Sequence, residues 1–353
     1  QTLALADTEE KNTGLQNAAN ELRAAVGDII EANRHDLAEA EKQNVGPTRL
    51  DRIMLDAARL EATANAVEAI IALPDPVGTV LAGWQVPSGL DITRVRVPLG
   101  VTGVIYESRP NVTADAAALC LKAGNAVILR GSSEIVQSAR AIHACFSRGL
   151  EAAGLDPDSV QLVPSTDRTA VGMMLGGLDG NIDVIVPRGG KNLVGRVQDE
   201  ARVPIFAHLE GICHVYVHGD ADLDMARNVV TNAKMRRPGI CGAAETLLVD
   251  KASAASHLAP IIGDLLDAGC EVRGCPQTCA TNSQVRAATD DDWGQEFLGP
   301  ILAVRVVDGL DEAMAHIARF GSNHTDAIIT ADAHAANRFL NEVDSAIVMH
   351  NCS

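Results

Sequence analysis

The segment from residue 101 to residue 130 constrains the fold most, because it predicts a strand, a helix and a second strand in direct succession. Residues 101–107 are apolar and β-branched, residues 113–122 are small and helix-forming, and residues 124–130 are again strand-like. Such a succession is typical of a βαβ unit, in which a helix joins two parallel strands. Further strands are expected at residues 160–163, 182–186, 212–217, 246–249, 301–307, 327–330 and 346–349. The alternation predicts an α/β fold.

Two long amphipathic helices are expected before this unit, at residues 15–41 and 50–71. Between residues 78 and 98, two short extended segments flank the turn at 87–89 and predict a β-hairpin. We expect this hairpin to be an oligomerisation element.

Composition excludes several classes of protein. The 353 residues are 47% hydrophobic but only 3% aromatic, which suits an aliphatic core of helices on a parallel sheet. The formal net charge of -17 repels phosphates and anionic lipid, so neither nucleic acid nor a membrane is expected as a partner. No apolar run is long enough to span a membrane and no secretion signal is recognisable, so a cytoplasmic location is expected.

The eight cysteines are irregularly spaced, which is typical of reduced thiols and not of a disulfide framework. Cys270, Cys275 and Cys279 lie close together, but no fourth ligand stands at zinc-finger spacing, so no metal site is expected.

Cys241 is the cysteine in the most reactive sequence context. It follows the helix-breaking residues 238–239 and precedes a strand, so it is expected on a loop. Lys234, Arg236 and Arg237 are close enough in the sequence to favour its thiolate and to attract an anion. A nucleophile is one interpretation, and a thiol packed as a small hydrophobe is the other.

Two glycine-bearing loops follow strands, at residues 131–134 and 187–190. In open parallel sheets, ligands bind at the carboxyl ends of strands, and the first loop also precedes a helix, where backbone amides can face an anion. Because neither loop carries a complete nucleotide-binding motif, an anion site and a plain turn both remain open.

Several segments together resemble the gamma-glutamyl phosphate reductase family of the aldehyde dehydrogenase superfamily, over essentially the whole chain. The segments that carry the resemblance lie at residues 97–113, 122–131, 186–190, 210–217, 232–241, 296–300 and 341–345. The resemblance implies a Rossmann-type cofactor domain over residues 1–212, which includes the hairpin, an α/β catalytic domain over residues 213–353, and a homo-oligomer. It leaves an association with glutamate 5-kinase open.

The implied reaction is the NADPH-dependent reduction of L-glutamyl 5-phosphate to glutamate 5-semialdehyde and phosphate, in proline biosynthesis. Cys241 would form a thioester and the Asn111 amide would stabilise the oxyanion, although Asn111 could instead form an Asx-turn. Arg109 and Arg237 are expected to bind the substrate. The cofactor residues implied are Arg130, Gly131, Ser132, Ser133, Gly189, Gly190 and Glu296. Ser133 stands where many NAD-preferring relatives carry an acid, which favours NADPH, whereas the neighbouring Glu134 does not.

Two departures from the family pattern keep alternatives open. His208 stands where oxidising aldehyde dehydrogenases carry the glutamate that activates water, which favours reduction, although His208 or Glu210 could substitute as the base. Family members continue for several dozen residues beyond the last residue here, so the chain is expected to be truncated at its carboxyl end. The alternatives are an NAD-dependent aldehyde oxidiser and an inactive subunit that acts only in assembly.

Overall fold

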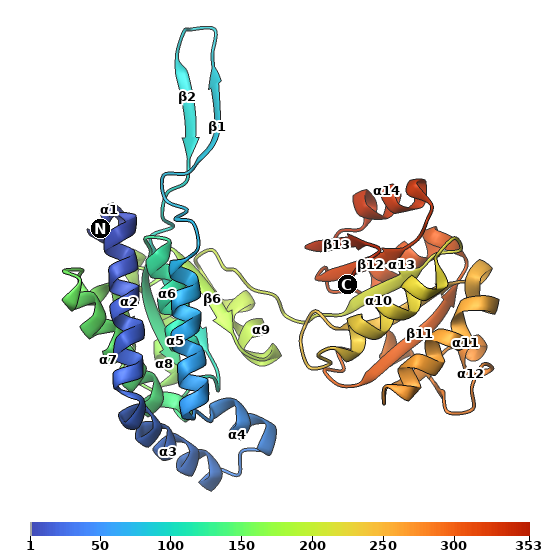
Figure 1. Ribbon diagram of the computed structural model, residues 1–353, viewed down its shortest axis with the longest axis horizontal. Helices are drawn as coiled ribbons and strands as arrows, with labels where there is room; N and C mark the ends of the chain where they lie inside the picture. The colour runs from blue at the N-terminus through green and yellow to red at the C-terminus, as the bar shows by residue number, and fades with distance from the viewer. Residues whose placement is uncertain (1) are drawn as a thin grey trace. The chain divides into compact units, whose positions relative to one another are not determined.

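The computed structural model describes residues 2–353, which divide into two compact units, Gln1–Ala207 and His208–Ser353 (Figure 1). Each unit is built on its own parallel sheet, with helices on both faces. The expected α/β fold is confirmed. Among the described residues, no helix combines the length and the apolar character needed to cross a membrane.

The first unit begins with five helices where the sequence predicts two. They are α1 Thr2–Leu5, α2 Thr8–Ala24, α3 Val26–Lys42, α4 Pro47–Ile53 and α5 Ala57–Ile71. The single helix predicted over 15–41 is wrong, because Ala25 leaves helical geometry and separates α2 from α3. Likewise, Asp56 caps a new helix by accepting a hydrogen bond from the Arg59 amide, which divides the helix predicted over 50–71. The apolar spacing continues through both breaks and therefore does not reveal them.

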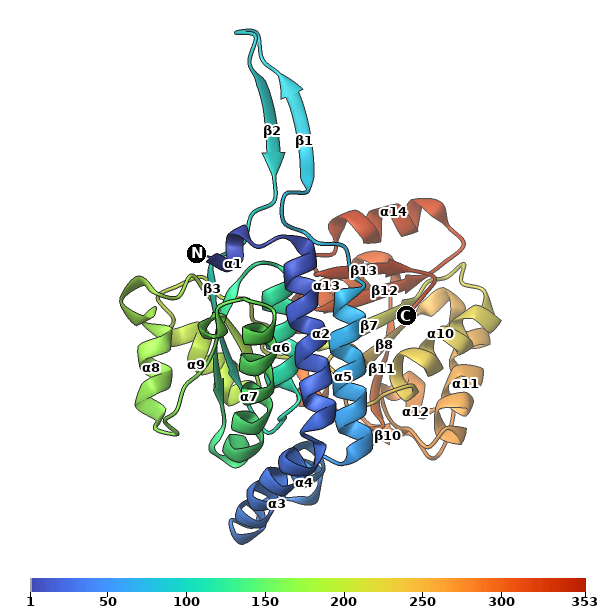
Figure 2. The ribbon, with the colours of Figure 1, turned by 60° about the vertical axis from the view of Figure 1, so that its left-hand side comes forward.

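The predicted hairpin is present and projects from its unit (Figures 1 and 2). Strand β1, Val80–Gln85, pairs antiparallel with β2, Asp91–Val95, and Trp84 lies opposite Ile92. All residues of both strands are exposed. An isolated two-stranded ribbon is marginally stable in water, and large apolar side chains are exposed on both of its strands.

The sheet of the first unit has four parallel strands in the order β5-β4-β3-β6. The strands are β3 Val101–Tyr106, β4 Ala126–Gly131, β5 Val160–Leu162 and β6 Val184–Arg188. The helices that accompany them are α6 Val112–Lys122, α7 Val136–Ala152, α8 Arg168–Leu175 and α9 Lys191–Glu200. The predicted βαβ unit is β3-α6-β4. The larger core joins α2, α5, α6 and α7 to the sheet, and a smaller one lies beneath α8 and α9.

The second unit is built on seven parallel strands in the order β10-β9-β11-β8-β7-β12-β13. The strands are β7 Cys213–Val217, β8 Ala244–Asp250, β9 Glu271–Gly274, β10 Arg286–Ala287, β11 Ile301–Val307, β12 Thr325–Ile329 and β13 Ile347–His350. The helices are α10 Leu223–Met235, α11 Lys251–Asp267, α12 Pro276–Cys279, α13 Gly309–Phe320 and α14 Ala333–Glu342. Helices α10 and α11 contribute to one core and α13 and α14 to the other. Strands β9 and β10 were not predicted, because they are short and only partly apolar.

Candidate active site

Cys241 lies on the loop between α10 and β8 and is half-buried. Its carbonyl oxygen accepts a hydrogen bond from the Cys213 thiol, at 3.1 Å. Gly211 packs so closely against this carbonyl that a Cβ atom would overlap it. The amide of Gly211 in turn donates to Oε1 of Glu296, at 2.8 Å. The loop backbone around the thiol is therefore fixed by contacts with two other segments.

A buried ion pair closes the base of the same loop. Nζ of Lys234, at the end of α10, lies 2.5 Å from Oε2 of Glu245, at the start of β8, and neither side chain is exposed. The other carboxylate oxygen accepts a hydrogen bond from the Leu298 amide, at 3.3 Å. Burial raises the pKa of Glu245 to about 7, against the opposing effect of the Lys234 ammonium. The expectation that Lys234 is a cation available near the thiol is wrong, because the pair holds it inside the unit.

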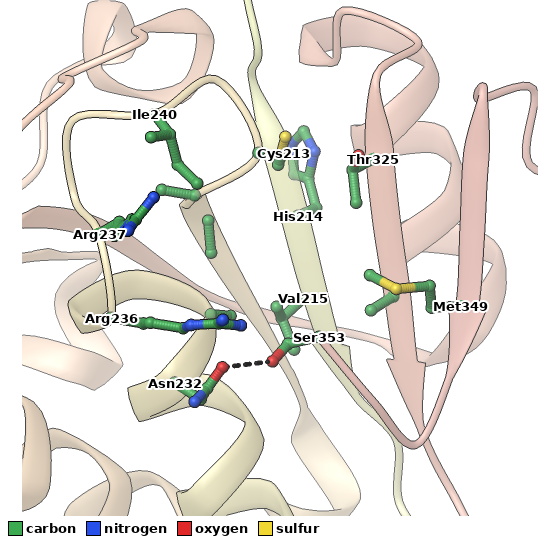
Figure 3. Close-up of a pocket in the computed structure, with 15 residues that line it drawn as sticks. Cys213, His214, Val215, Asn232, Arg236, Arg237, Ile240, Thr325, Met349 and Ser353 are labelled. Atoms are coloured by element: carbon green, nitrogen blue, oxygen red, sulfur yellow. Dashed lines mark hydrogen bonds between the residues drawn. The ribbon is translucent and has the colours of Figure 1, made fainter. Parts of the chain in front are cut away.

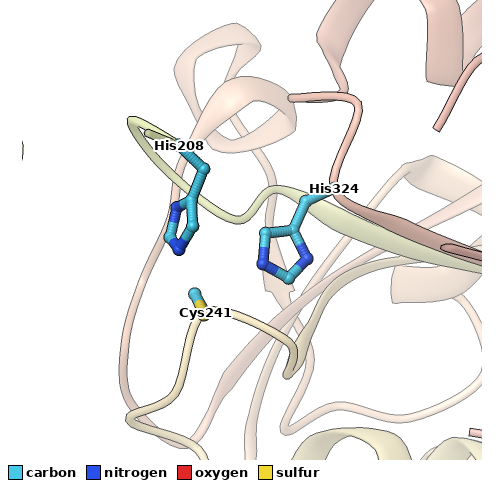
Figure 4. Close-up of side chains that lie close together, drawn as sticks. All are labelled: His208, Cys241 and His324. Atoms are coloured by element: carbon cyan, nitrogen blue, oxygen red, sulfur yellow. The ribbon is translucent and has the colours of Figure 1, made fainter. Parts of the chain in front are cut away.

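Two imidazoles lie beside the thiol (Figure 4). The potential ligand atoms of His208, Cys241 and His324 all lie within 4.8 Å of one another. The two rings meet edge to face, with centroids 5.0 Å apart. Nδ1 of His324 is 2.8 Å from Oγ1 of Thr325. Burial, followed by the neighbouring His208, lowers the pKa of His324, so this imidazole is neutral at physiological pH.

His324 was missed in the sequence. It lies far along the chain from Cys241 and carries no recognisable motif, and only the pairing of β12 with β7 brings it to the thiol. His208, in contrast, was singled out, and the structure places it at the thiol.

Cys241 and the neighbouring Cys213 differ in how deeply they are buried. Cys213 is buried at the start of β7, and this desolvation raises its pKa to about 12. A thiol with so high a pKa stays protonated and is a poor nucleophile. Of the two neighbouring sulfur atoms, the half-exposed one on the loop is accessible to a substrate.

A cavity of about 240 Å³ lies within the second unit, beside the Cys241 loop (Figure 3). Arg236, Arg237 and Ile240 line it from the loop side, and Cys213 and Thr325 line it from the sheet. The cavity thus places Arg237, a predicted substrate ligand, and Arg236 close to the segment that carries the thiol.

In the first unit, a cavity of about 580 Å³ lies at the carboxyl end of β4. Arg130, Ser132 and Ser133 line it, together with Arg168 and Arg196. The structure thus brings three of the predicted cofactor residues together, but Gly131 is not among the residues that line the cavity.

Arg130 is mostly buried, and one of its N–H groups has no acceptor among the described residues. Its Nη2 atom donates to the carbonyl of Thr166, at 2.9 Å, while its buried Nε finds no partner among the described residues. Burial lowers the pKa of Arg130, and the positive charge of Arg168 acts in the same direction. An acceptor on a bound ligand would satisfy the free N–H group.

Glu134 is the acidic residue that argues against NADPH, because it would repel the 2′-phosphate. In the structure its carboxylate is held by two other side chains. Its Oε2 atom accepts a hydrogen bond from the Ser108 hydroxyl at 2.7 Å and lies 3.1 Å from Nε of Arg49. The charge of this carboxylate is therefore balanced by an arginine, which reduces its repulsion of an anion in the cavity.

The second glycine loop of this unit begins α9. The amide of Gly190 donates to Oε2 of Glu107, at 3.0 Å, and a Cβ atom on Gly189 would lie 2.6 Å from the same oxygen. A larger residue at position 189 would therefore displace the end of the Glu107 side chain.

Asn111 and Arg109 lie ahead of α6 in the first unit. Asn111 is the N-cap residue, but its side chain makes no cap hydrogen bond and Nδ2 donates to Oδ2 of Asp115, at 2.9 Å. The side-chain amide of Asn111 therefore points toward Asp115, and its side chain does not cap α6 as an Asx-turn would. Burial lowers the pKa of Arg109, as do the neighbouring charges of Arg188 and Arg52.

Comparison with known proteins identifies the family. The sequence matches the aldehyde dehydrogenase family over residues 8–264. It is 61% identical to the gamma-glutamyl phosphate reductase of Parvibaculum lavamentivorans, over 99% of this chain and 83% of that protein. The crystal structure of gamma-glutamyl phosphate reductase from Thermotoga maritima superposes with a TM-score of 0.96 at 40% identity, over 100% of this chain and 85% of the other.

A more distant structure shares the fold. An engineered glycolyl-CoA reductase solved with bound NADP+ superposes with a TM-score of 0.67 at 14% identity, over 100% of this chain and 84% of the other. The fold, the cysteine loop and these similarities agree, and the chain belongs to the gamma-glutamyl phosphate reductase family of the aldehyde dehydrogenases.

Proposed function

We propose that this chain is the NADPH-dependent reductase that converts L-glutamyl 5-phosphate to L-glutamate 5-semialdehyde and phosphate in proline biosynthesis. Membership of the family makes it an oxidoreductase. The observation that supports the mechanism most strongly is the half-buried thiol of Cys241, on a loop fixed from beneath, with two imidazoles within 4.8 Å.

Cys241 would act as the nucleophile. A neutral imidazole beside it can accept the thiol proton, after which the sulfur attacks the acyl carbon and the bond from that carbon to the phosphate oxygen breaks. The products of this step are a thioester on Cys241 and free phosphate. By the family resemblance, His208 stands where oxidising relatives carry the glutamate that activates water, which favours transfer of hydride to the thioester over its hydrolysis.

The remaining substrate contacts are assigned from residue chemistry. The Asn111 amide would donate to the oxyanion that forms on the acyl oxygen. Arg109 and Arg237 would bind the substrate carboxylate and phosphate, since a guanidinium matches both groups in geometry and charge.

The cavity beside β4 fits the adenosine end of a nicotinamide cofactor. Arg130, Ser132 and Ser133 would hold the ribose and its 2′-phosphate there, since Arg130 has a free buried N–H group and Glu134 is paired with Arg49. Further contacts are assigned to Gly131, Gly189, Gly190 and Glu296. When bound, NADPH supplies the hydride that reduces the acyl group.

The reverse reaction tests the proposal. The chain should oxidise glutamate semialdehyde with NADP+ in phosphate buffer, and Cys241→Ala should lower kcat by roughly a thousandfold or more. Cys352→Ser, a change at an exposed thiol, is the matched control and should leave the rate unchanged. Replacing phosphate with a non-nucleophilic buffer should stop turnover. Equal rates for the parent and Cys241→Ala would exclude the thioester.

The same assay separates the alternatives. An aldehyde oxidiser that releases a free acid would continue to turn over without phosphate, and it would prefer NAD+. A subunit that acts only in assembly would show no turnover in either direction and no change in fluorescence on titration with NADPH.

A further inference from the structure

We propose that His208, Cys241 and His324 form a binding site for Zn²⁺, and that zinc bound there reversibly blocks the enzyme. All three residues belong to the second unit, of which His208 is the first residue.

The three side chains converge from separate segments. His208 precedes β7, Cys241 lies between α10 and β8, and His324 directly precedes β12. Their ligand atoms lie within 4.8 Å of one another (Figure 4). Around a tetrahedral zinc ion, with bonds of about 2.0 to 2.3 Å, the ligand atoms are roughly 3.3 to 3.6 Å apart. Binding would therefore draw the ligand atoms closer together, and the His208 ring, which is exposed, can rotate to allow this.

The surroundings of His324 match those of a metal ligand. Nδ1 lies 2.8 Å from the Thr325 hydroxyl, which orients the ring and leaves Nε2 for the ion. A hydrogen bond to the other ring nitrogen is nearly universal among metal-binding histidines. The Cys241 loop is equally constrained, by the buried pair of Lys234 and Glu245. Two of the three ligands are thus held in position before an ion binds.

The ligand types narrow the choice of ion. Two imidazoles and one thiolate suit Zn²⁺, Co²⁺ or copper, whereas Mg²⁺ and Ca²⁺ prefer oxygen ligands. Copper sites of this kind add a weak axial ligand such as Met, so we name Zn²⁺. Binding replaces the thiol proton with the ion, so one proton is released for each ion that binds to Cys241. With three protein ligands, the fourth position stays open to water. Among the described residues, Cys270, Cys275 and Cys279 do not form such a group.

The expected consequence is inhibition, and this part rests on the proposed function. A thiolate that is bound to zinc cannot attack the acyl carbon, so the ion and the substrate would compete for Cys241. Removing the ion with a chelator would restore the nucleophile.

Cobalt provides a readout that does not depend on activity. Co²⁺ bound to a thiolate shows a sulfur-to-metal charge-transfer band, and tetrahedral Co²⁺ shows intense visible bands. The parent protein should develop both on titration with Co²⁺, and Zn²⁺ should displace them. Cys241→Ser should abolish the charge-transfer band.

The histidine variants test the other two ligands. Removing a group that only hydrogen-bonds a metal ligand costs about 10- to 100-fold in metal affinity, so loss of a ligand itself in His208→Ala or His324→Ala should weaken binding by roughly 100-fold. His208 is exposed, and its replacement should not disturb folding. Cys352→Ser and His334→Ala, at exposed positions elsewhere in the second unit, are the matched controls and should bind as the parent does.

Failure of this inference can be distinguished from failure of the proposed function. A charge-transfer band that persists in Cys241→Ser, or an affinity unchanged by both histidine variants, would overturn the zinc site even if Cys241 is essential for turnover. Cobalt bands that depend on Cys241 would support the site even if Cys241→Ala remained active, in which case the thioester mechanism would fail instead.

Discussion

The cavity beside β4 and the loop that carries Cys241 use their charged side chains differently. In the cavity, several arginines line the space, and Arg130 keeps a buried N–H group with no partner among the described residues. At the loop, Lys234 is paired with Glu245 and Glu296 is bonded to Gly211, so the thiol and two imidazoles remain beside one another. The cavity therefore keeps a buried donor that a bound acceptor could satisfy, whereas the charges at the loop fix the backbone around the thiol.

The largest expected effect comes from breaking the pair beneath the loop. Lys234→Met leaves Glu245 buried without its cation. At a pH well above 7, where the Glu245 carboxylate is charged, loss of one partner from a buried pair costs about 3–5 kcal/mol. Urea denaturation should show this loss in the free energy of unfolding, and turnover should fall because the Cys241 loop loses its support.

The double variant Lys234→Met with Glu245→Leu is the control for that experiment. It replaces both charges with apolar groups of similar volume and should recover most of the lost stability. If the double variant were as unstable as Lys234→Met, packing and not charge would explain the loss.

A smaller effect is expected at the cavity. Ser133→Asp places a carboxylate beside the proposed 2′-phosphate site. Repulsion between the two anions should lower the affinity for NADPH by about 10- to 100-fold and should lower the affinity for NADH much less. Dissociation constants for both cofactors measure the effect. Thr93→Asp, an exposed position of the hairpin in the same unit, should change neither constant. Equal weakening of both cofactors by Ser133→Asp would place the 2′-phosphate elsewhere.

The two regions also differ in how much of them the sequence predicts. Arg130, at the end of β4, and Ser132 and Ser133, just after it, follow one another along the chain. The strand, the turn and the helix start left an anion site and a plain turn both open, and only the family resemblance implied that these three residues bind a cofactor. The site of Cys241 combines segments that are far apart. His324 reaches it only through the order of strands in a seven-stranded sheet, and the burial of Lys234 depends on packing that local composition does not determine.

The ionisation of Glu245, at the base of the Cys241 loop, should make the stability of the protein depend on pH. Its pKa is raised by burial from 4.5 to about 7, so its contribution to stability is full below pH 4.5 and is lost as the pH rises through 7. The parent protein should therefore lose stability over this range relative to the variant that lacks both Lys234 and Glu245. Unfolding midpoints in urea, measured from pH 5 to pH 8, provide the test, and parallel curves for the two proteins would contradict the assignment.

Changes in the hairpin should have the least effect on the cavity beside β4 and on the Cys241 loop. Both of its strands are exposed, and so are the side chains of Trp84 and Ile92. Replacing both residues with serine should reduce the mass seen in sedimentation to that of one chain, if this ribbon pairs subunits. Fluorescence of Trp293, buried in the second unit, should remain unchanged, and Co²⁺ should still bind at Cys241. Thr93→Asp, at an exposed position paired with Gly83, is the control. An unchanged mass in the serine variant would show that the apolar ribbon is not what joins subunits, and a changed Trp293 signal would show that the hairpin affects the unit that holds the thiol.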